Sequence, residues 1–556
     1  MQNEHDSLER VWGGMDSVFQ QWEPHFRELS RSFDPGRQRF EKDTENQKWH
    51  FNRTMIDPNP TLAARTLSYG MMAGVTNPST PWIKLQTEDE DLNKFHSVRL
   101  WLDDVSKRIL NQLARSNFYN VMPSMYSDLG IYSTGNVTMA EDPKTVIRFE
   151  QRPMGSYRIA NSERLDTNQW AAEYKFTAQQ LVNKFGKDNC SNAVQSAFDA
   201  KDFKSMFPIR HLIAPRANFN PERMDAKNMP FMSIYWEPGN GDGKILRESG
   251  FRTFPSISPR WEVVGNDSYG SFAPGMIALG TARGLQKDHK TRYEAQDKMV
   301  NPPLNVPASL RNNRASLVPG GVNYIPDNNM GAKIEPVFNV NYPIGDVLNS
   351  IGDSRAIIDQ SFFADLFLLI TNINRSNVTA TEIAERQEEK LLMLGPVLNR
   401  LNEEALDPVI ERMFDEMNRR GMLPPPPPEL EGVEIQIEYI SMMAQAQKLV
   451  GLGSIERSVS FIGNLSASKP EVLDKINADA VVDEYVRITG ANPVIINSDE
   501  KVGVIRKQRA EQQQAEQIAA SAQPMEQAAG AAKLLSETDT GGQSALQLMQ
   551  ANLGGL

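Results

Sequence analysis

Cysteine is almost absent from this chain of 556 residues. Cys190 is its single cysteine, so one chain can form neither an internal disulfide nor a cysteine metal cluster. This scarcity predicts a reducing compartment, or a particle that is assembled in one.

Long apolar stretches are missing as well. The densest stretch, residues 362–370, contains Asp365 and is shorter than the roughly 20 residues that span a bilayer. The N-terminal residues lack the basic start and apolar core of a signal peptide. We therefore expect a protein that is soluble and cytoplasmic when made, without a membrane partner.

The chain also lacks an excess of positive charge. It has 59 Lys and Arg against 70 Asp and Glu, a formal net charge of −11. Wrapping of duplex DNA depends on neutralising phosphates with Lys and Arg, so the balance argues against that mode of binding. The acidic net charge is compatible with a surface along which DNA moves without being bound tightly. The hydrophobic share of 40% and charged share of 23% indicate a globular protein, with about two to four domains.

Motifs for catalysis are missing too. The six histidines include no pair spaced as in His-Glu-x-x-His. Residues 239–244 resemble a phosphate loop only superficially, because the earlier Gly and the following Ser or Thr are absent. Cys190 lies in a polar turn without a neighbour that would activate its thiolate. We expect no catalytic residue, no metal site and no cofactor, and therefore no enzyme; a metal-dependent nuclease built from dispersed carboxylates is the alternative.

Helical periodicity is the main pattern in what is present. The first 30 or so residues are amphipathic as far as Pro35, and Asn59 or Thr61 is a candidate cap for the second helix. Thr177 is the expected cap of a later one. Further helices are expected over residues 61–73, 91–115, 119–129, 177–185, 274–300, 346–370 and 381–420. The helix over 91–115 has a predicted buried stripe made of Phe95, Val98, Leu102, Val105, Ile109 and Leu113.

Strand patterns occupy much of the middle of the chain. Together with the helices they predict an α+β fold that is mainly helical. The expected strands cover residues 137–139, 145–149, 157–159, 169–176, 209–213, 232–236, 245–248 and 433–439.

A polar break at residues 371–379 separates an apolar helix from the long amphipathic helix at 381–420. Such a break must face water or a polar partner. Its candidate contact residues are Asn372, Asn374, Arg375, Ser376 and Asn377. The alternative is an ordinary connection between helices with a solvent-facing Arg.

Two further features concern the long helices. Arg283, Lys287 and Lys290 are spaced by three and four residues and share one face of the helix at 274–300. This face is either a surface for DNA or a solvated helix face with acidic neighbours. Pro396 and Pro408 lie inside the second long helix and are expected to kink it.

The order of four segments resembles that of bacteriophage portal proteins, the head-to-tail connectors of short-tailed phages (podovirus type). No segment is a catalytic fingerprint, and the resemblance covers residues of about 55–420. The segments are 57–78 with Trp82 after it, 176–186, 269–274 followed by the helix that ends at Asn301-Pro302-Pro303, and 378–383 leading into the long helix.

The resemblance implies a dodecameric ring whose subunits have a wing, a stem, a clip, a crown and a C-terminal helical barrel. On this resemblance the break at 371–379 is a tunnel loop that projects into the channel, and Arg283, Lys287 and Lys290 are candidate stem or channel residues. By position, the expected regions are 1–175 and 301–429 for the wing, 176–204 for a candidate first stem helix, 205–270 for the clip, 271–300 for a stem helix, 430–500 for the crown, and 501–556 for the barrel or a flexible tail.

The implied function is a portal ring at a unique capsid vertex, through which double-stranded DNA is packaged and ejected without sequence-specific binding. The implied partners are the terminase, the major capsid and scaffold proteins, and a tail adaptor. The implied location is the virion, with assembly in the host cytoplasm. Another structural component of the head or tail, such as an adaptor or scaffold, is the second alternative.

Overall fold

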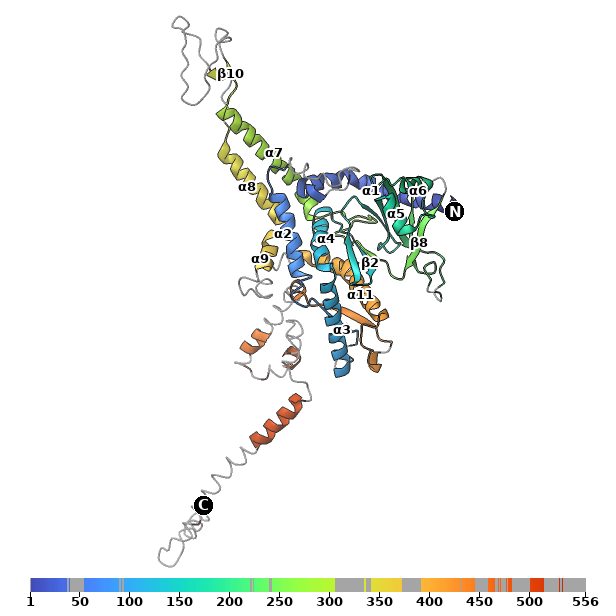
Figure 1. The fold of residues 1–556 in the computed structure, drawn as a ribbon. Helices are drawn as coiled ribbons and strands as arrows, with labels where there is room; N and C mark the ends of the chain where they lie inside the picture. The colour runs from blue at the N-terminus through green and yellow to red at the C-terminus, as the bar shows by residue number, and fades with distance from the viewer. Residues whose placement is uncertain are drawn as a thin grey trace, which may run out of the picture. The chain divides into compact units, whose positions relative to one another are not determined.

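A computed structural model gives the fold (Figure 1). The chain divides into two compact units, Met1–Ser454 and Ile455–Leu556. The mixture of helices and strands confirms the expected α+β class. The structure describes residues 2–37, 40, 55–89, 92, 95–220, 223, 225–239, 243–305, 335–336, 342–372, 392–430, 432–445, 459–465, 469, 471, 477, 479–482, 501–514, 530 and 533.

The N-terminal third of the first unit is mostly helical. The stripe predicted for α3 is buried from Val98 to Leu113, but Phe95 is 52% exposed because it precedes the first turn. The helices are α1 (Gln2–Phe33), α2 (Asn59–Gly74), α3 (His96–Arg115) and α4 (Phe118–Tyr132).

Two local expectations for these helices are wrong. Neither Asn59 nor Thr61 caps α2; instead the Asp57 carboxylate accepts a hydrogen bond from the Asn59 backbone N–H at 2.9 Å. The α4 helix continues through Gly130 rather than ending there. Gly130 lies close to α2, because a Cβ at this position would lie 2.8 Å from Leu67 Cδ2.

Two antiparallel sheets form the middle of the first unit, and each expected strand between residues 137 and 248 is present. A three-stranded sheet has the order β3-β2-β9, and a five-stranded sheet has the order β4-β5-β6-β7-β8. The strands are β2 (Val137–Asp142), β3 (Val146–Gln151), β4 (Tyr157–Asn161), β5 (Thr167–Thr177), β6 (Met206–Pro215), β7 (Phe231–Trp236), β8 (Ile245–Phe251) and β9 (Ser256–Ile257).

Helices cover both faces of the five-stranded sheet. Side chains alternate along a strand, so Leu212 of β6 packs with Trp12 of α1 on one face, whereas Ile209 packs with α5 (Ala178–Phe185) and α6 (Asn192–Asp199) on the other. Thr177 caps α5, as the sequence predicted, and the structure adds a capping box with Gln180. Residues 176–204 therefore form the end of β5 and two short helices against this sheet, and 205–270 continue the same sheets.

Two long helices, α7 (Pro274–Val300) and α8 (Ile344–Ser361), lie side by side (Figure 1). The short strands β10 (Leu304–Asn305) and β11 (Glu335–Pro336) pair near their far end. The helix expected over 346–370 is two helices, since α9 (Ala364–Asn372) begins after a break at Phe362 and Phe363. Phe363 adopts a φ of 54°, and Phe362 packs on Phe33 with ring centroids 5.3 Å apart.

The second long amphipathic segment is helical from residue 392 where the structure describes it. A π-helical turn, Asn402–Leu406, precedes α11 (Asp407–Arg419). Pro408 lacks an N–H, and the Asp407 N–H bonds to the Asn402 carbonyl, five residues earlier. A π-bulge therefore precedes Pro408, and the kinks expected at Pro396 and Pro408 stay predictions.

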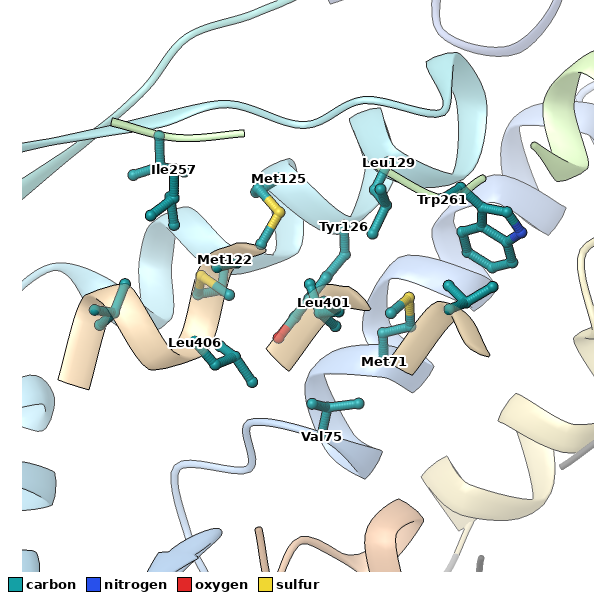
Figure 2. Close-up of a cluster of buried hydrophobic side chains, with 14 of the residues drawn as sticks. Met71, Val75, Met122, Met125, Tyr126, Leu129, Ile257, Trp261, Leu401 and Leu406 are labelled. Atoms are coloured by element: carbon teal, nitrogen blue, oxygen red, sulfur yellow. The ribbon is translucent and has the colours of Figure 1, made fainter. Parts of the chain in front are cut away.

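One hydrophobic core joins these helices to the three-stranded sheet. Figure 2 shows part of it, where Leu401 and Leu406 face Tyr126 and Met122 of α4, with Met71 and Val75 of α2 beside them. Strand β12 (Ile435–Tyr439) pairs with β1 (Ile83–Thr87), a strand that the sequence analysis missed, and so returns the chain to this core.

The second unit is described only in part. Residues 501–514 are helical, and Arg506 donates two hydrogen bonds to Asp479, at 2.6 and 2.7 Å. The crown and barrel boundaries stay predictions.

Candidate functional site

The base of the α7–α8 pair is organised around one buried carboxylate, Asp57, just before α2. The residue is 2% exposed. Its Oδ2 atom lies 2.7 Å from His289 Nε2 on α7 and 2.9 Å from Arg355 Nε on α8. A single side chain therefore ties the start of α2 to both helices of the pair.

Gln286 completes this junction through the backbone. Its side-chain oxygen accepts hydrogen bonds from the N–H groups of Ile56 and Asp57, at 2.7 and 2.9 Å, and its amide donates to the Asp57 carbonyl at 2.8 Å. Asn59 donates to Asp359 of α8 at 3.1 Å. These hydrogen bonds offset the desolvation of the groups that make them. Within the described part of the chain, Asn59 Oδ1 and both ring nitrogens of His289 form no hydrogen bond of good geometry, so the His289 contact with Asp57 is one of charge and proximity.

The pKa values of the two carboxyl groups in the junction, Asp57 and Asp359, are shifted in opposite directions. Burial alone raises the pKa of Asp57, but the hydrogen bonds from Asn59 and Arg355 and the charges of Arg355 and His289 outweigh burial, and the pKa is lowered. Burial is the main cause that raises the pKa of Asp359. Asp57 is therefore the charged centre of the junction at neutral pH.

The predicted basic face of α7 is exposed, and all three of its residues are on the surface: Arg283, Lys287 and Lys290. Arg283 lies 3.3 Å from Glu28 of α1, and Lys290 lies 3.9 Å from Glu294. Exposed ion pairs of this kind contribute little and are screened by salt. The structure therefore brings the three cations together on one accessible face.

Most of the polar break lies outside the described residues. Asn372 is the last residue of α9, and Asn374, Arg375, Ser376 and Asn377 are not among the residues that the structure describes. Their role in a channel stays a prediction.

The position of α9, which leads into the break, is fixed by close packing on α2. A Cβ added at Gly70 would lie 2.3 Å from the Phe367 Cβ, so only glycine permits this approach. Phe367 itself is fully buried. The start of the polar break is thus held by contact between α2 and α9.

The chemistry of Cys190 agrees with the sequence analysis. The side chain is buried, its Sγ donates to the Gly186 carbonyl at 3.2 Å, and burial raises the pKa of the thiol to about 11. The side chain is therefore a neutral thiol at neutral pH, without the thiolate character that reactivity requires.

In the part of the chain that the structure describes, no three or more His, Cys, Asp or Glu side chains come together in a way that could hold a metal ion. Among the described helices, none combines the length and apolar character that crossing a membrane would need.

Sequence reasoning missed the Asp57 junction. Locally, the Asp57-Pro58-Asn59-Pro60 segment indicates only a helix entry, and the surroundings of His289 in the sequence indicate only a surface or packing residue. The partners come from α7 and α8, far along the chain, so local spacing contains no signal for them. The polar residues Gln286 and His289, which lie on α7 near its apolar face, are the clue that the sequence offers.

Comparisons with known proteins identify relatives of the chain. The model of the family described as "Bacteriophage head to tail connecting protein" matches residues 5–496. The portal protein of Salmonella phage epsilon15 is 42% identical over 525 residues, which cover 94% of each chain. A probable portal protein of Bordetella phage BPP-1 is 40% identical over 545 residues, which cover 98% of each chain.

Two solved structures are also similar. A chain in the neck of an empty gene transfer agent particle has a TM-score of 0.35 and 9% identity, with 83% of this chain and 97% of that chain covered. A chain in the virion of a native gene transfer agent particle has a TM-score of 0.30 and 11% identity, with 72% and 89% covered. The assignment rests on the sequence relatives, which span nearly the whole chain: this protein belongs to the family of bacteriophage head-to-tail connecting proteins, and its predicted resemblance to phage portal proteins is confirmed.

Proposed function

We propose that identical copies of this chain close into a dodecameric ring at one capsid vertex, and that double-stranded DNA passes along the axis of the ring during packaging and ejection. The observation that carries the proposal is the match to portal proteins over nearly the full length of the chain. The role is that of a structural conduit, without catalysis.

The α7–α8 pair is the element that suits a stem. Two helices that pack along each other and meet at the Asp57 junction form a stiff projection. We therefore assign α8 as the partner of α7 in the stem, in place of residues 176–204, which the sequence suggested as a first stem helix. The segment between the pair, residues 301–343, then takes the place of the clip that the sequence analysis gave to 205–270, whose strands belong to the two sheets.

DNA would contact the ring through charges that are few and exposed. Arg283, Lys287 and Lys290 line one face of α7, and Arg375 would add one positive charge for each copy at the polar break. Contacts of this kind reach phosphates without reading bases. In an assembly whose chains each carry a net charge of −11, they would guide DNA without holding it strongly.

The proposal includes partners beyond DNA. A connector at the vertex must contact the major capsid and scaffold proteins during assembly, the terminase during packaging, and a tail adaptor afterwards. The motor's ATP hydrolysis then belongs to the terminase, which agrees with the missing phosphate loop. The ring would be assembled in the host cytoplasm and end in the virion.

Negative-stain electron microscopy of the purified full chain tests the proposal. Rings with a central hole about as wide as duplex DNA are expected. Monomers, rods or filled spheres would contradict it. A second test addresses catalysis: plasmid DNA incubated with the protein and Mg²⁺ should stay uncut, whereas cutting that is lost with EDTA would favour the nuclease alternative.

A further inference from the structure

A cavity of about 400 Å³ lies between the two sheets of the first unit, away from the α7–α8 pair. One wall comes from β2 and β3, with Met139 and Glu150, and the other from β5, β6 and β7, with Trp170, His211 and Tyr235. This volume is in the range of sites that bind small ligands or single side chains. Nothing in the proposed conduit role uses it.

The wall formed by the five-stranded sheet is aromatic. The rings of Tyr174 and Phe176 are stacked with centroids 5.6 Å apart, and those of His211 and Tyr235 with centroids 3.8 Å apart. Trp170 meets His211 edge to face at 5.4 Å. Flat stacked rings offer an apolar surface to a flat or branched apolar group.

The charges that line the cavity are mainly positive. Arg152 lies over Tyr174, 4.8 Å from the ring centroid, and is paired with Glu150 at 2.5 Å. The Lys184 ammonium lies 4.8 Å from the Tyr235 ring centroid. Among the described residues no carboxylate lies within ion-pair distance of Lys184, so its charge is available to a ligand.

His211 adds an unpartnered polar atom. The residue is 5% exposed, and its Nε2 is 2.8 Å from Ser233 Oγ. Its Nδ1 has no hydrogen-bond partner. The pKa of His211 lies well below its ordinary value. Burial is the main cause, and the positive charges of Lys184, Arg152 and Arg247 add to it. The imidazole is therefore neutral, and a buried polar atom of this kind is costly unless a ligand or water satisfies it.

We propose that this cavity binds a carboxylate attached to an aromatic or other apolar group. The apolar group would lie on the rings of Tyr174, Phe176 and Tyr235, and the carboxylate would pair with Lys184. A polyanion such as a nucleic acid backbone fits less well, because Glu150 is part of the lining. The chemistry suits either the C-terminal residue of a peptide or a free aromatic acid.

Binding of matched probes to the full-length protein tests the proposal. The probes are N-acetylphenylalanine and its uncharged amide, followed by saturation-transfer NMR and calorimetric titration. The acid should bind about tenfold more tightly than the amide, the effect expected from one charge-assisted hydrogen bond. Equal binding of the two probes, or binding of neither, would overturn the proposal. Phenylacetate serves as the third probe: tighter binding than N-acetylphenylalanine identifies free aromatic acids as the ligand class, and weaker binding identifies chain ends.

Variants on the same short segment locate the site. Lys184→Met should weaken binding of the acid about tenfold, and Lys184→Glu should abolish it. Lys187→Met is the matched control, because Lys187 pairs with Asp199 at 2.6 Å and lies outside the cavity. If Lys184→Met binds the acid as wild type does while its melting temperature is unchanged, the assignment is wrong.

Discussion

Asp57 Oδ2 and His289 Nε2 lie 2.7 Å apart, and this contact joins the start of α2 to the middle of α7. The same carboxylate oxygen lies 2.9 Å from Arg355 Nε on α8. One buried side chain of the subunit body thus contacts both helices of the proposed stem.

Replacing Asp57 by Asn should lower the free energy of unfolding by about 2 kcal/mol, because removing one partner of a buried pair leaves the others uncompensated. The figure is below the usual range for buried pairs because the Arg355 side chain is 47% exposed. All eight tryptophans lie in the first unit, so urea unfolding followed by tryptophan fluorescence reports on it. Asp297→Asn, an exposed change on α7, is the control and should be neutral.

The contribution of Asp57 should depend on pH in a defined direction. Its folded-state pKa is lowered from an ordinary value of 3.8, so the stabilisation is fully present above pH 3.8 and is lost as pH falls through the folded-state pKa. The stability difference between wild type and Asp57→Asn should therefore shrink below about pH 4. Asp359, whose pKa is raised, should show a difference of opposite sign: Asp359→Asn should be more stable than wild type at neutral pH, and this gain should disappear as pH falls below about 4. A difference for Asp57→Asn that stays constant down to about pH 2.5, well below the ordinary pKa of 3.8, would contradict this account.

Gly70→Ala should destabilise the first unit by about 1–3 kcal/mol, the usual cost of overpacking a core. The added methyl would fall 2.3 Å from the Phe367 Cβ, and α2 and α9 would have to separate. Gly280→Ala on α7 is the matched change, since no atom lies within 4 Å of its added Cβ. It should be neutral or stabilise by up to about 1 kcal/mol. Equal melting temperatures for the two variants would exclude a tight α2–α9 contact.

Glu404→Gln should destabilise the protein by about 3 kcal/mol, because it leaves Arg260 buried without its counter-charge. Arg260 Nη2 lies 2.6 Å from Glu404 Oε1, and their side chains are 5% and 17% exposed. The pair connects the loop after β9 to the π-helical turn. Glu403→Gln, on the same turn, tests whether the effect is specific; denaturant midpoints of the two variants give the answer.

Arg375→Ala tests the polar break in its proposed role. Rings of normal size should form, but capsids complemented with this variant should retain several-fold less DNA, because each copy loses its one cation at the break. Arg164→Ala, at an exposed turn between β4 and β5, should leave DNA retention unchanged. DNA content per particle, measured by quantitative PCR after nuclease treatment, distinguishes the outcomes. If the Arg375→Ala variant retained as much DNA as wild type, the proposal that the break faces the channel would be contradicted.

Periodic and capped elements could be predicted from the sequence because their signals are local. The buried stripe of α3 from Val98 to Leu113 follows from spacing of three and four. The start of α5 is signalled locally by Thr177, which forms a capping box with Gln180 three residues later. The relatives likewise confirm the family that was expected from the order of segments.

Features that arise from contacts distant in sequence were missed. The break between α8 and α9 contains no Gly or Pro, and Phe363 is held at positive φ by packing that includes Trp261, 6.3 Å away. Strand β1 needs β12 as its partner. The Asp57 junction needs side chains from α7 and α8. Each depends on tertiary packing that local pattern does not encode.

The pairing of β12 with β1 determines where a shortened protein can end. The backbone N–H of Ile440 donates to the Trp82 carbonyl at 3.0 Å, and the Tyr439 hydroxyl donates to Asp407 at 2.5 Å. A truncation before residue 435 would strip β1 of its neighbour and expose a bare strand edge, which promotes aggregation. Fragments for crystallography or for separate study of the first unit should therefore extend past Ile440.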